Sequence, residues 1–140
     1  MNDDYRLQRF AQAQAPVYDN AIAILRDGMM CTPWMDFIFP RLAGTGQGTT
    51  RFAIASLDEA RAYLAFPLLG NRYRECVEAL TWSAGRTAGE VFGPDDAGKL
   101  HASLTLFAEA TNEQLMRIML SVWYRDMVDE RTMAQLQEMY

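Results

Sequence analysis

The stretch GPDDAGKLHASLTLF, residues 93–107, decides the fold class of this chain. A Gly-Pro pair ends the preceding segment, and the two aspartates after it suit a helix N-terminus, because acidic side chains complement the helix macrodipole there. Leu100, Leu104 and Phe107 then recur at helical spacing. The stretch therefore predicts a helix that opens at the aspartates and buries this apolar stripe.

Helix signals continue on both sides of this stretch. Ser56 with Glu59, and Thr87 with Glu90, have the spacing of a capping box. Strand signals are weak, and residues 51–55 are the only short candidate. We predict an all-α fold in which residues 1–140 form one domain of about seven or eight short helices. Apolar stripes mark the other expected helices in residues 7–14, 18–25, 57–64, 69–80 and 113–124, and a last helix follows Asp129.

The composition restricts the classes of function. Half of the residues are hydrophobic and 22% are charged, which is typical of a folded globular domain. The net charge of −5 and the sequence pI near 4.8 argue against a nucleic-acid binder that works through a basic face. No apolar run is long enough to span a membrane, and the polar N-terminus lacks the apolar core of a signal peptide. We expect a cytoplasmic protein without nucleic-acid or membrane partners.

Histidine and cysteine usage argues against a metal site. His101 is the only histidine, which excludes every metal motif that needs two. Cys76 lies on an apolar stripe and is expected to be buried, whereas Cys31 precedes a Thr-Pro pair in a loop and is the more reactive candidate. We expect no metal and no cofactor, and no nucleophile can be paired with a base by its spacing, so the sequence identifies no catalytic residue.

The glycine-rich segment GTGQG, residues 44–48, is the one conspicuous loop. It superficially resembles a phosphate-binding loop, but a P-loop needs a Lys-Ser/Thr pair that opens a helix. Thr49, Thr50 and Arg51 follow here instead. We interpret the segment as a flexible loop that could fold over a ligand.

A polar stripe interrupts the apolar pattern of residues 93–107. Asp96, Lys99 and Ser103 stand at i, i+3 and i+7, so one helix can direct all three to the same side. Lys99 is the only lysine of the chain. Ser103 and Thr105 lie among residues expected to be buried, where hydroxyls need partners. Two explanations stay open: Asp96 and Lys99 form a surface ion pair worth roughly a few tenths of a kcal/mol, or the stripe marks a pocket.

Several short motifs stand in a fixed order along the chain. They are LQRF and AQAPVY (7–10 and 13–18), WM and FIFP (34–35 and 37–40), SLDEARAYL (56–64), LG and REC (69–70 and 74–76), and FG, DD, KL, S and TLF (92–93, 95–96, 99–100, 103 and 105–107). In this order they resemble a bacterial family known as the domain of unknown function eighteen-ten, whose members are often mislabelled calpastatin. The resemblance covers nearly the whole chain. It implies an α-helical fold of the helical-hairpin superhelix type and no established activity.

The chain also departs from the pattern of that family. Its members usually carry a basic run that ends in Ser-His before the first Trp, and this chain has MMCTP, residues 29–33, at that place. Asp36 stands where the family has a second Trp, and Arg41 where it has a Gln. The polar residues of 96–105 match the family, so the resemblance implies a site whose second half is kept and whose first half is altered.

Two hypotheses from different functional classes follow. The leading one is a module that binds a small molecule or an anion, with Lys99 as a point charge, Trp34 as a stacking face and the glycine loop as a lid. Trp34 also fits a purely structural role, because aromatic residues in a short apolar segment usually fill a core. The alternative is a protein-interaction or oligomerisation module, because the helix in residues 113–124 is apolar on two stripes and the chain has nine methionines. The ligand-binding residues that we predict are Trp34, Arg51, Asp96, Lys99, Ser103 and Thr105.

Overall fold

The computed structural model describes residues 3–29, 32–45 and 50–140. Cys31 and residues 46–48 of the glycine loop lie outside the described residues. The reactive thiol and the lid therefore stay predictions from the sequence.

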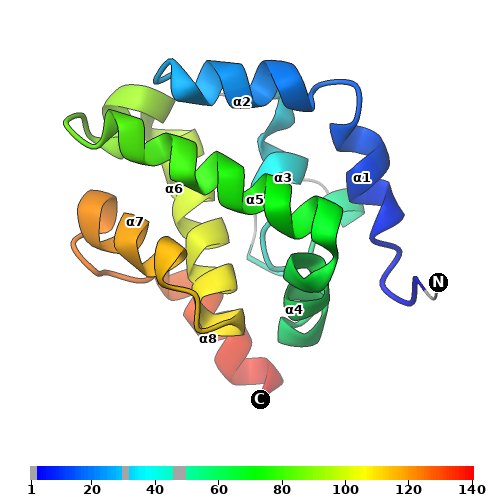
Figure 1. The fold of residues 1–140 in the computed structure, drawn as a ribbon. Coiled ribbons are helices and arrows are strands. Elements are labelled where there is room, and N and C mark those ends of the chain that lie inside the picture. Colours follow the sequence, from blue (N-terminus) through cyan, green and yellow to red (C-terminus); the bar gives the residue numbers. More distant parts are fainter. Residues whose placement is uncertain (1–2, 30–31, 46–49) are drawn as a thin grey trace.

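Eight α-helices make up most of the described chain (Figure 1). In the described ranges no named strand occurs, and Leu42 and Ile54 form an isolated β-bridge, which is all that the strand candidate in residues 51–55 contributes. None of the helices there is both long and apolar enough to cross a membrane. The all-α prediction is confirmed. The helices are α1 (Gln8–Gln14), α2 (Tyr18–Arg26), α3 (Met35–Ile38), α4 (Leu57–Ala65), α5 (Pro67–Leu80), α6 (Ala88–Ala110), α7 (Gln114–Tyr124) and α8 (Glu130–Met139), and short 3-10 turns lie at Thr32–Trp34, Thr50–Phe52 and Thr81–Ser83.

Helix α6 bends where the sequence predicts a new helix start. Gly93 has a φ of +79°, a conformation that favours glycine, and Pro94 follows it inside the helix. At the start of α6 the expected capping box is present. The Glu90 N–H donates to Thr87 Oγ1 at 3.1 Å, and the Thr87 N–H donates to Glu90 Oε1 at 2.8 Å. The two segments that the sequence separates therefore meet at a non-helical residue, Gly93, within the range of α6.

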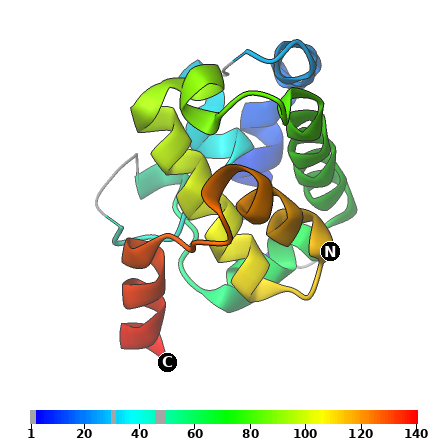
Figure 2. The ribbon, with the colours of Figure 1, turned by 90° about the vertical axis from the view of Figure 1, so that its left-hand side faces the viewer.

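The part of α6 after the bend lies at the centre of the fold. It packs against α4, α7 and α8, and Figures 1 and 2 show these helices around it from two sides. Leu100, Leu104 and Phe107 are fully buried, as their spacing predicts. The ring of Phe107 lies 4.4 Å from that of Tyr73 in α5 and 5.3 Å from that of Tyr63 in α4, measured between centroids. Aromatic contacts thus join α6 to the α4–α5 pair.

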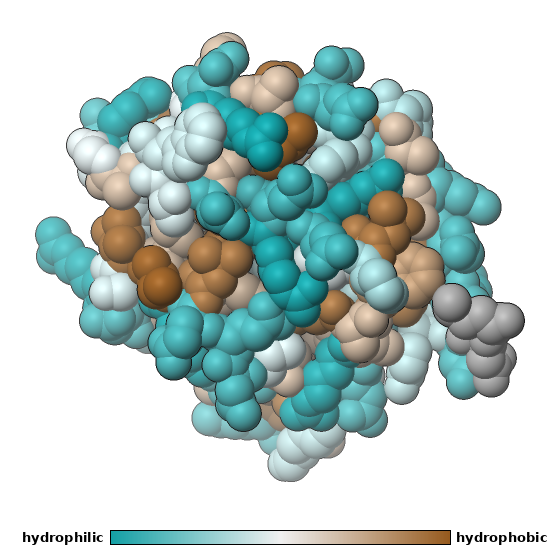
Figure 3. All heavy atoms as spheres, viewed as in Figure 1, coloured by the Kyte–Doolittle hydropathy of each residue, from teal (hydrophilic) through white to brown (hydrophobic). Residues whose placement is uncertain are grey.

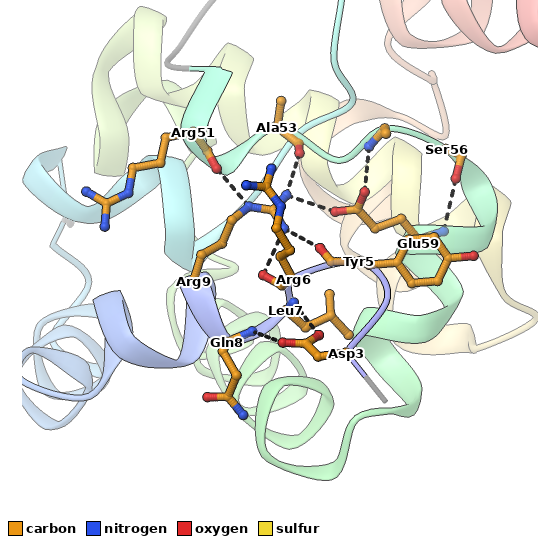
Figure 4. A network of polar contacts seen from close by, with 11 residues as sticks. Asp3, Tyr5, Arg6, Leu7, Gln8, Arg9, Arg51, Ala53, Ser56 and Glu59 are labelled. Atoms are coloured by element: carbon orange, nitrogen blue, oxygen red, sulfur yellow. Dashed lines mark hydrogen bonds and ion pairs between the residues drawn. The ribbon is translucent and has the colours of Figure 1, made fainter. Parts of the chain in front are cut away.

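A partly buried arginine attaches the N-terminal helix to the rest of the protein (Figure 4). Arg9 of α1 donates from Nε to the Arg51 carbonyl at 2.7 Å, and from Nη2 to the Ala53 carbonyl at 2.8 Å and to Glu59 Oε2 at 2.9 Å. Glu59 Oε1 accepts the Ala55 N–H at 3.1 Å. The Glu59 carboxylate therefore fastens both α1 and the segment before α4.

The capping box expected at α4 forms only in half. Ser56 Oγ accepts the Glu59 N–H at 3.1 Å, as the spacing predicts. The Glu59 side chain does not complete the box, because its two oxygens receive Arg9 and the Ala55 N–H. A partner fifty residues away in the sequence has displaced a local contact.

Helix α7 buries one face and exposes another. Met116, Met119 and Leu120 are buried, whereas Ile118 and Val122 are 48% and 46% exposed. Figure 3 shows hydrophobic residues gathered on the side of the molecule where α7 lies. Of the two apolar stripes that the sequence indicates, the one with Met116 and Leu120 therefore faces the core, whereas the one with Ile118 and Val122 largely faces outward.

Removing the Glu59 charge should loosen the attachment of α1. In Glu59→Gln the Arg9 guanidinium loses a charged, nearly buried partner, and we expect the free energy of unfolding to fall by about 2 kcal/mol in chemical denaturation. Asp58→Asn is the matched control, because Asp58 pairs with Arg61 at 3.1 Å on the exposed side of the same helix turn. Its loss should stay within about 0.5 kcal/mol. Equal losses in the two variants would contradict this role of Glu59.

Candidate functional site

Asp96 and Lys99 lie one turn apart on α6, as predicted, but they are not an ordinary surface pair. The Lys99 Nζ is 3.7 Å from Asp96 Oδ1. The Asp96 side chain is 6% exposed and that of Lys99 is 25% exposed. The carboxylate is therefore in the protein interior, and the ammonium lies at its edge.

The two predicted hydroxyls have protein partners inside the core. Ser103 Oγ and the Tyr73 hydroxyl are 2.9 Å apart, and burial raises the pKa of Tyr73, which keeps it protonated. Thr105 Oγ1 accepts the N–H of Asp129, the residue before α8, at 2.9 Å. Both hydroxyls hold neighbouring helices in place, and their contact with a ligand stays a prediction.

Arg51 and Trp34 lie in other parts of the described chain. The Arg51 guanidinium is 5.0 Å from the centroid of the Phe52 ring, and the Arg51 carbonyl accepts from Arg9 of α1. Figure 4 shows the Arg51 side chain pointing away from that network. Trp34 is partly buried and packs against the core. The contacts of these two residues do not bring them to Lys99.

Lys99 lines a cavity of about 340 Å³, which we call the Lys99 cavity. Three segments form its walls: the chain at 41–45, one face of α6, and residues 127–131 at the start of α8. A volume of this size is at the lower end of the range for small-molecule sites. The lining residues are Arg41, Thr45, Gly98, Lys99, His101, Ala102, Met127, Val128, Asp129, Glu130 and Arg131.

Each of the three walls contributes a cation. Arg41 is buried, and its Nη2 lies 2.6 Å from Asp36 Oδ1. Lys99 comes from α6, and Arg131 lies exposed in the first turn of α8. The sequence could not show this convergence, because it depends on how the 41–45 segment and α8 fold back onto α6.

His101 holds one wall of the cavity in place. Its ring stacks on Tyr124 with centroids 4.1 Å apart and an interplanar angle of 2°, and its Nε2 is 2.7 Å from the Met127 carbonyl oxygen. Because a carbonyl only accepts, Nε2 must carry the hydrogen. Tyr124 in turn donates to the Ala97 carbonyl at 2.7 Å, and burial raises its pKa. These contacts fix the path of the chain from α7 to α8.

Comparison with known proteins identifies the family of this chain. Residues 4–136 match the model of a family described as "Protein of unknown function (DUF1810)". The chain belongs to the DUF1810 family. The resemblance drawn from the ordered motifs is thereby confirmed.

A crystal structure with the same fold supports the DUF1810 assignment. The conserved hypothetical protein Rv1873 from Mycobacterium tuberculosis is 43% identical to this chain, with a TM-score of 0.93. The match covers 96% of this chain and 99% of that one. No curated protein matches.

The structure joins the two residues that the sequence leads us to expect as departures from the family. Asp36 and Arg41 form an ion pair with each other at 2.6 Å. Arg41 also lines the Lys99 cavity. The Asp36–Arg41 ion pair therefore lies beside the cavity.

Proposed function

We propose that this chain is a binding module that takes a small anionic ligand in the Lys99 cavity. The observation that carries the proposal is the convergence of Arg41, Lys99 and Arg131, from three separate segments, on one cavity. Cationic side chains with N–H donors are the usual means of holding phosphate and carboxylate groups. The lining also contains the carboxylates of Asp129 and Glu130, so the proposal depends on where the three cations lie rather than on a net positive charge of the cavity.

The existing ion pairs leave donors for a ligand. The distance of 3.7 Å between Lys99 Nζ and Asp96 Oδ1 exceeds hydrogen-bond length, so this contact does not use the ammonium N–H groups. A guanidinium carries five N–H donors, and the Arg41 contact with Asp36 does not exhaust them. Two carboxylates, those of Asp129 and Glu130, also line the cavity, and Oδ2 of Asp129 accepts from the N–H and the hydroxyl of Thr132.

The proposal gives most of the predicted site residues a place. Lys99 contacts the ligand, and Asp96 positions the Lys99 ammonium. Ser103 and Thr105 support the walls through Tyr73 and Asp129. Trp34 and Arg51 are not among the described residues that line the cavity, and their contact with a ligand stays a prediction from the sequence. Arg41 and Arg131 are added to the set.

Binding, rather than catalysis, is what these residues support. His101 is engaged with Tyr124 and the Met127 carbonyl, so its donor nitrogen holds the wall. Among the described lining residues Thr45 is the one with a hydroxyl, and its Oγ1 donates to the Leu42 carbonyl at 2.9 Å. The described lining residues therefore include no nucleophile paired with a base.

Removing the Lys99 charge should weaken anion binding. In a nuclear magnetic resonance titration with inorganic phosphate, we expect amide signals of residues 98–102 and 129–131 to shift, and the Kd to rise about tenfold in Lys99→Gln. Arg26→Gln is the matched control, because Arg26 is half-exposed on α2 and only loosely paired with Glu75 at 3.9 Å. Phosphate that shifts no amide of the cavity, or an unchanged Kd in Lys99→Gln, would contradict the proposal.

A second candidate function is self-association through α7. Ile118 and Val122 form the exposed apolar stripe there, and the ion pairs Arg117–Glu109 and Arg74–Glu113 supply charges near it. In a two-fold symmetric dimer, the exposed apolar stripe of α7 in one protomer would pack against the same stripe of its partner. The apolar stripe is narrow, so a dimer formed through it would be weak.

Sedimentation over a range of protein concentrations tests this second candidate. We expect a concentration-dependent dimer that disappears in Ile118→Asp, because the substitution would bury a charge in the contact. Leu68→Asp is the matched control, since Leu68 is a similarly exposed aliphatic residue on α5. A monomer at every concentration, or equal loss of dimer in both variants, would exclude the α7 contact.

A further inference from the structure

We propose that the ligand of the Lys99 cavity is elongated, with an anionic group at one end and an amine at the other. This inference rests on the proposed anion-binding function and names the class of ligand. It comes from a second cavity of about 350 Å³, lined by Gly44, Thr45, Arg131, Ala134, Gln135 and Glu138.

The two cavities are neighbours along α8. Thr45 and Arg131 line both of them. The Lys99 cavity continues past the start of α8, and the second cavity follows the helix toward its C-terminus. Together they offer a groove between the 41–45 segment and α8, which is longer than a phosphate or carboxylate group requires.

The face of α8 that lines the second cavity is mostly polar, with a cation and a carboxylate at different positions along the helix. Residues 131, 134, 135 and 138 stand at i, i+3, i+4 and i+7, so they share one face of α8. Thr132 and Leu136 are buried on another face. Arg131 and Glu138 are seven residues apart, which is an axial separation of about 10 Å. Arg131 therefore lies at one end of this face and Glu138 at the other, with Asp129 and Glu130 next to Arg131 at the first end.

A polar face of a helix is ordinarily only solvated. Here a chain segment stands opposite it. Thr45 is buried, and a Cβ atom at Gly44 would lie 2.9 Å from Gln135 Nε2, so the absence of a side chain at Gly44 allows this close approach. Gly44 has a φ of +85°, which also favours glycine. The Gln135 amide is thus held against the wall between the two ends of the groove.

The charged side chains at the two ends of the groove, Arg131 and Glu138, do not pair with each other. Within the described ranges neither Arg131 nor Glu138 forms an ion pair. Arg131, Lys99 and Arg41 suit an anion, whereas the Glu138 carboxylate suits an ammonium group. A phosphate monoester that carries a terminal amine about two helix turns from the phosphate has the complementary pattern.

The experiment compares two probes that differ only in the amine. 6-Aminohexyl phosphate and hexyl phosphate are titrated into the full chain by calorimetry at low salt. We expect 6-aminohexyl phosphate to bind up to about fivefold more tightly, since an exposed charge pair contributes at most about 1 kcal/mol. Glu138→Gln should remove this difference and leave the Kd of hexyl phosphate unchanged. Lys99→Gln should weaken both probes.

A matched control and the unfolding curve separate this effect from damage to the fold. Glu78→Gln changes an exposed glutamate of α5 and should leave the preference for 6-aminohexyl phosphate intact. The Glu138→Gln variant should unfold at the wild-type denaturant concentration, because Glu138 is exposed.

The outcomes distinguish the two proposals. Equal binding of the two probes, or a preference that survives Glu138→Gln, overturns the amine end and leaves the anion site standing. Failure of both probes to bind overturns the anion site and the inference with it.

Discussion

Every residue of α6 from 102 to 108 is buried, and this is the constraint on which the other helices depend. Two of these residues carry hydroxyls, and a buried hydroxyl without a partner is costly. Ser103 meets the Tyr73 hydroxyl of α5, and Thr105 meets the N–H of Asp129 at the start of α8. The polar groups of the central helix thus fix the positions of two helices that are distant in sequence.

The position of α8 in turn creates the candidate site. Asp129 caps α8 through the N–H and the hydroxyl of Thr132, so the first turn of the helix begins beside α6. His101 holds the Met127 carbonyl just before it. The helix therefore presents Arg131 to the cavity that Lys99 lines from α6. The site is a consequence of packing rather than of one contiguous motif.

The local features of the fold were predictable from the sequence, and the long-range ones were not. The Gly93 break, the Thr87 cap and the stripe of Leu100, Leu104 and Phe107 depend on residues within a few positions of each other, and all are present. Lys99 stood out because it is the only lysine.

The features that could not be predicted from the sequence depend on contacts between distant segments. Spacing shows that Ser103 and Thr105 are buried but does not reveal their partners. The turn between α7 and α8 places Arg131 at the cavity. Two residues of this turn, Arg125 and Asp126, have a positive φ, which no local sequence pattern predicts. The most direct test of the account is a crystal structure with tungstate, whose anomalous signal locates a phosphate-like anion. We expect one site in the cavity, within hydrogen-bond distance of the Lys99 ammonium. Tungstate bound only outside that cavity, or not at all, would contradict the account.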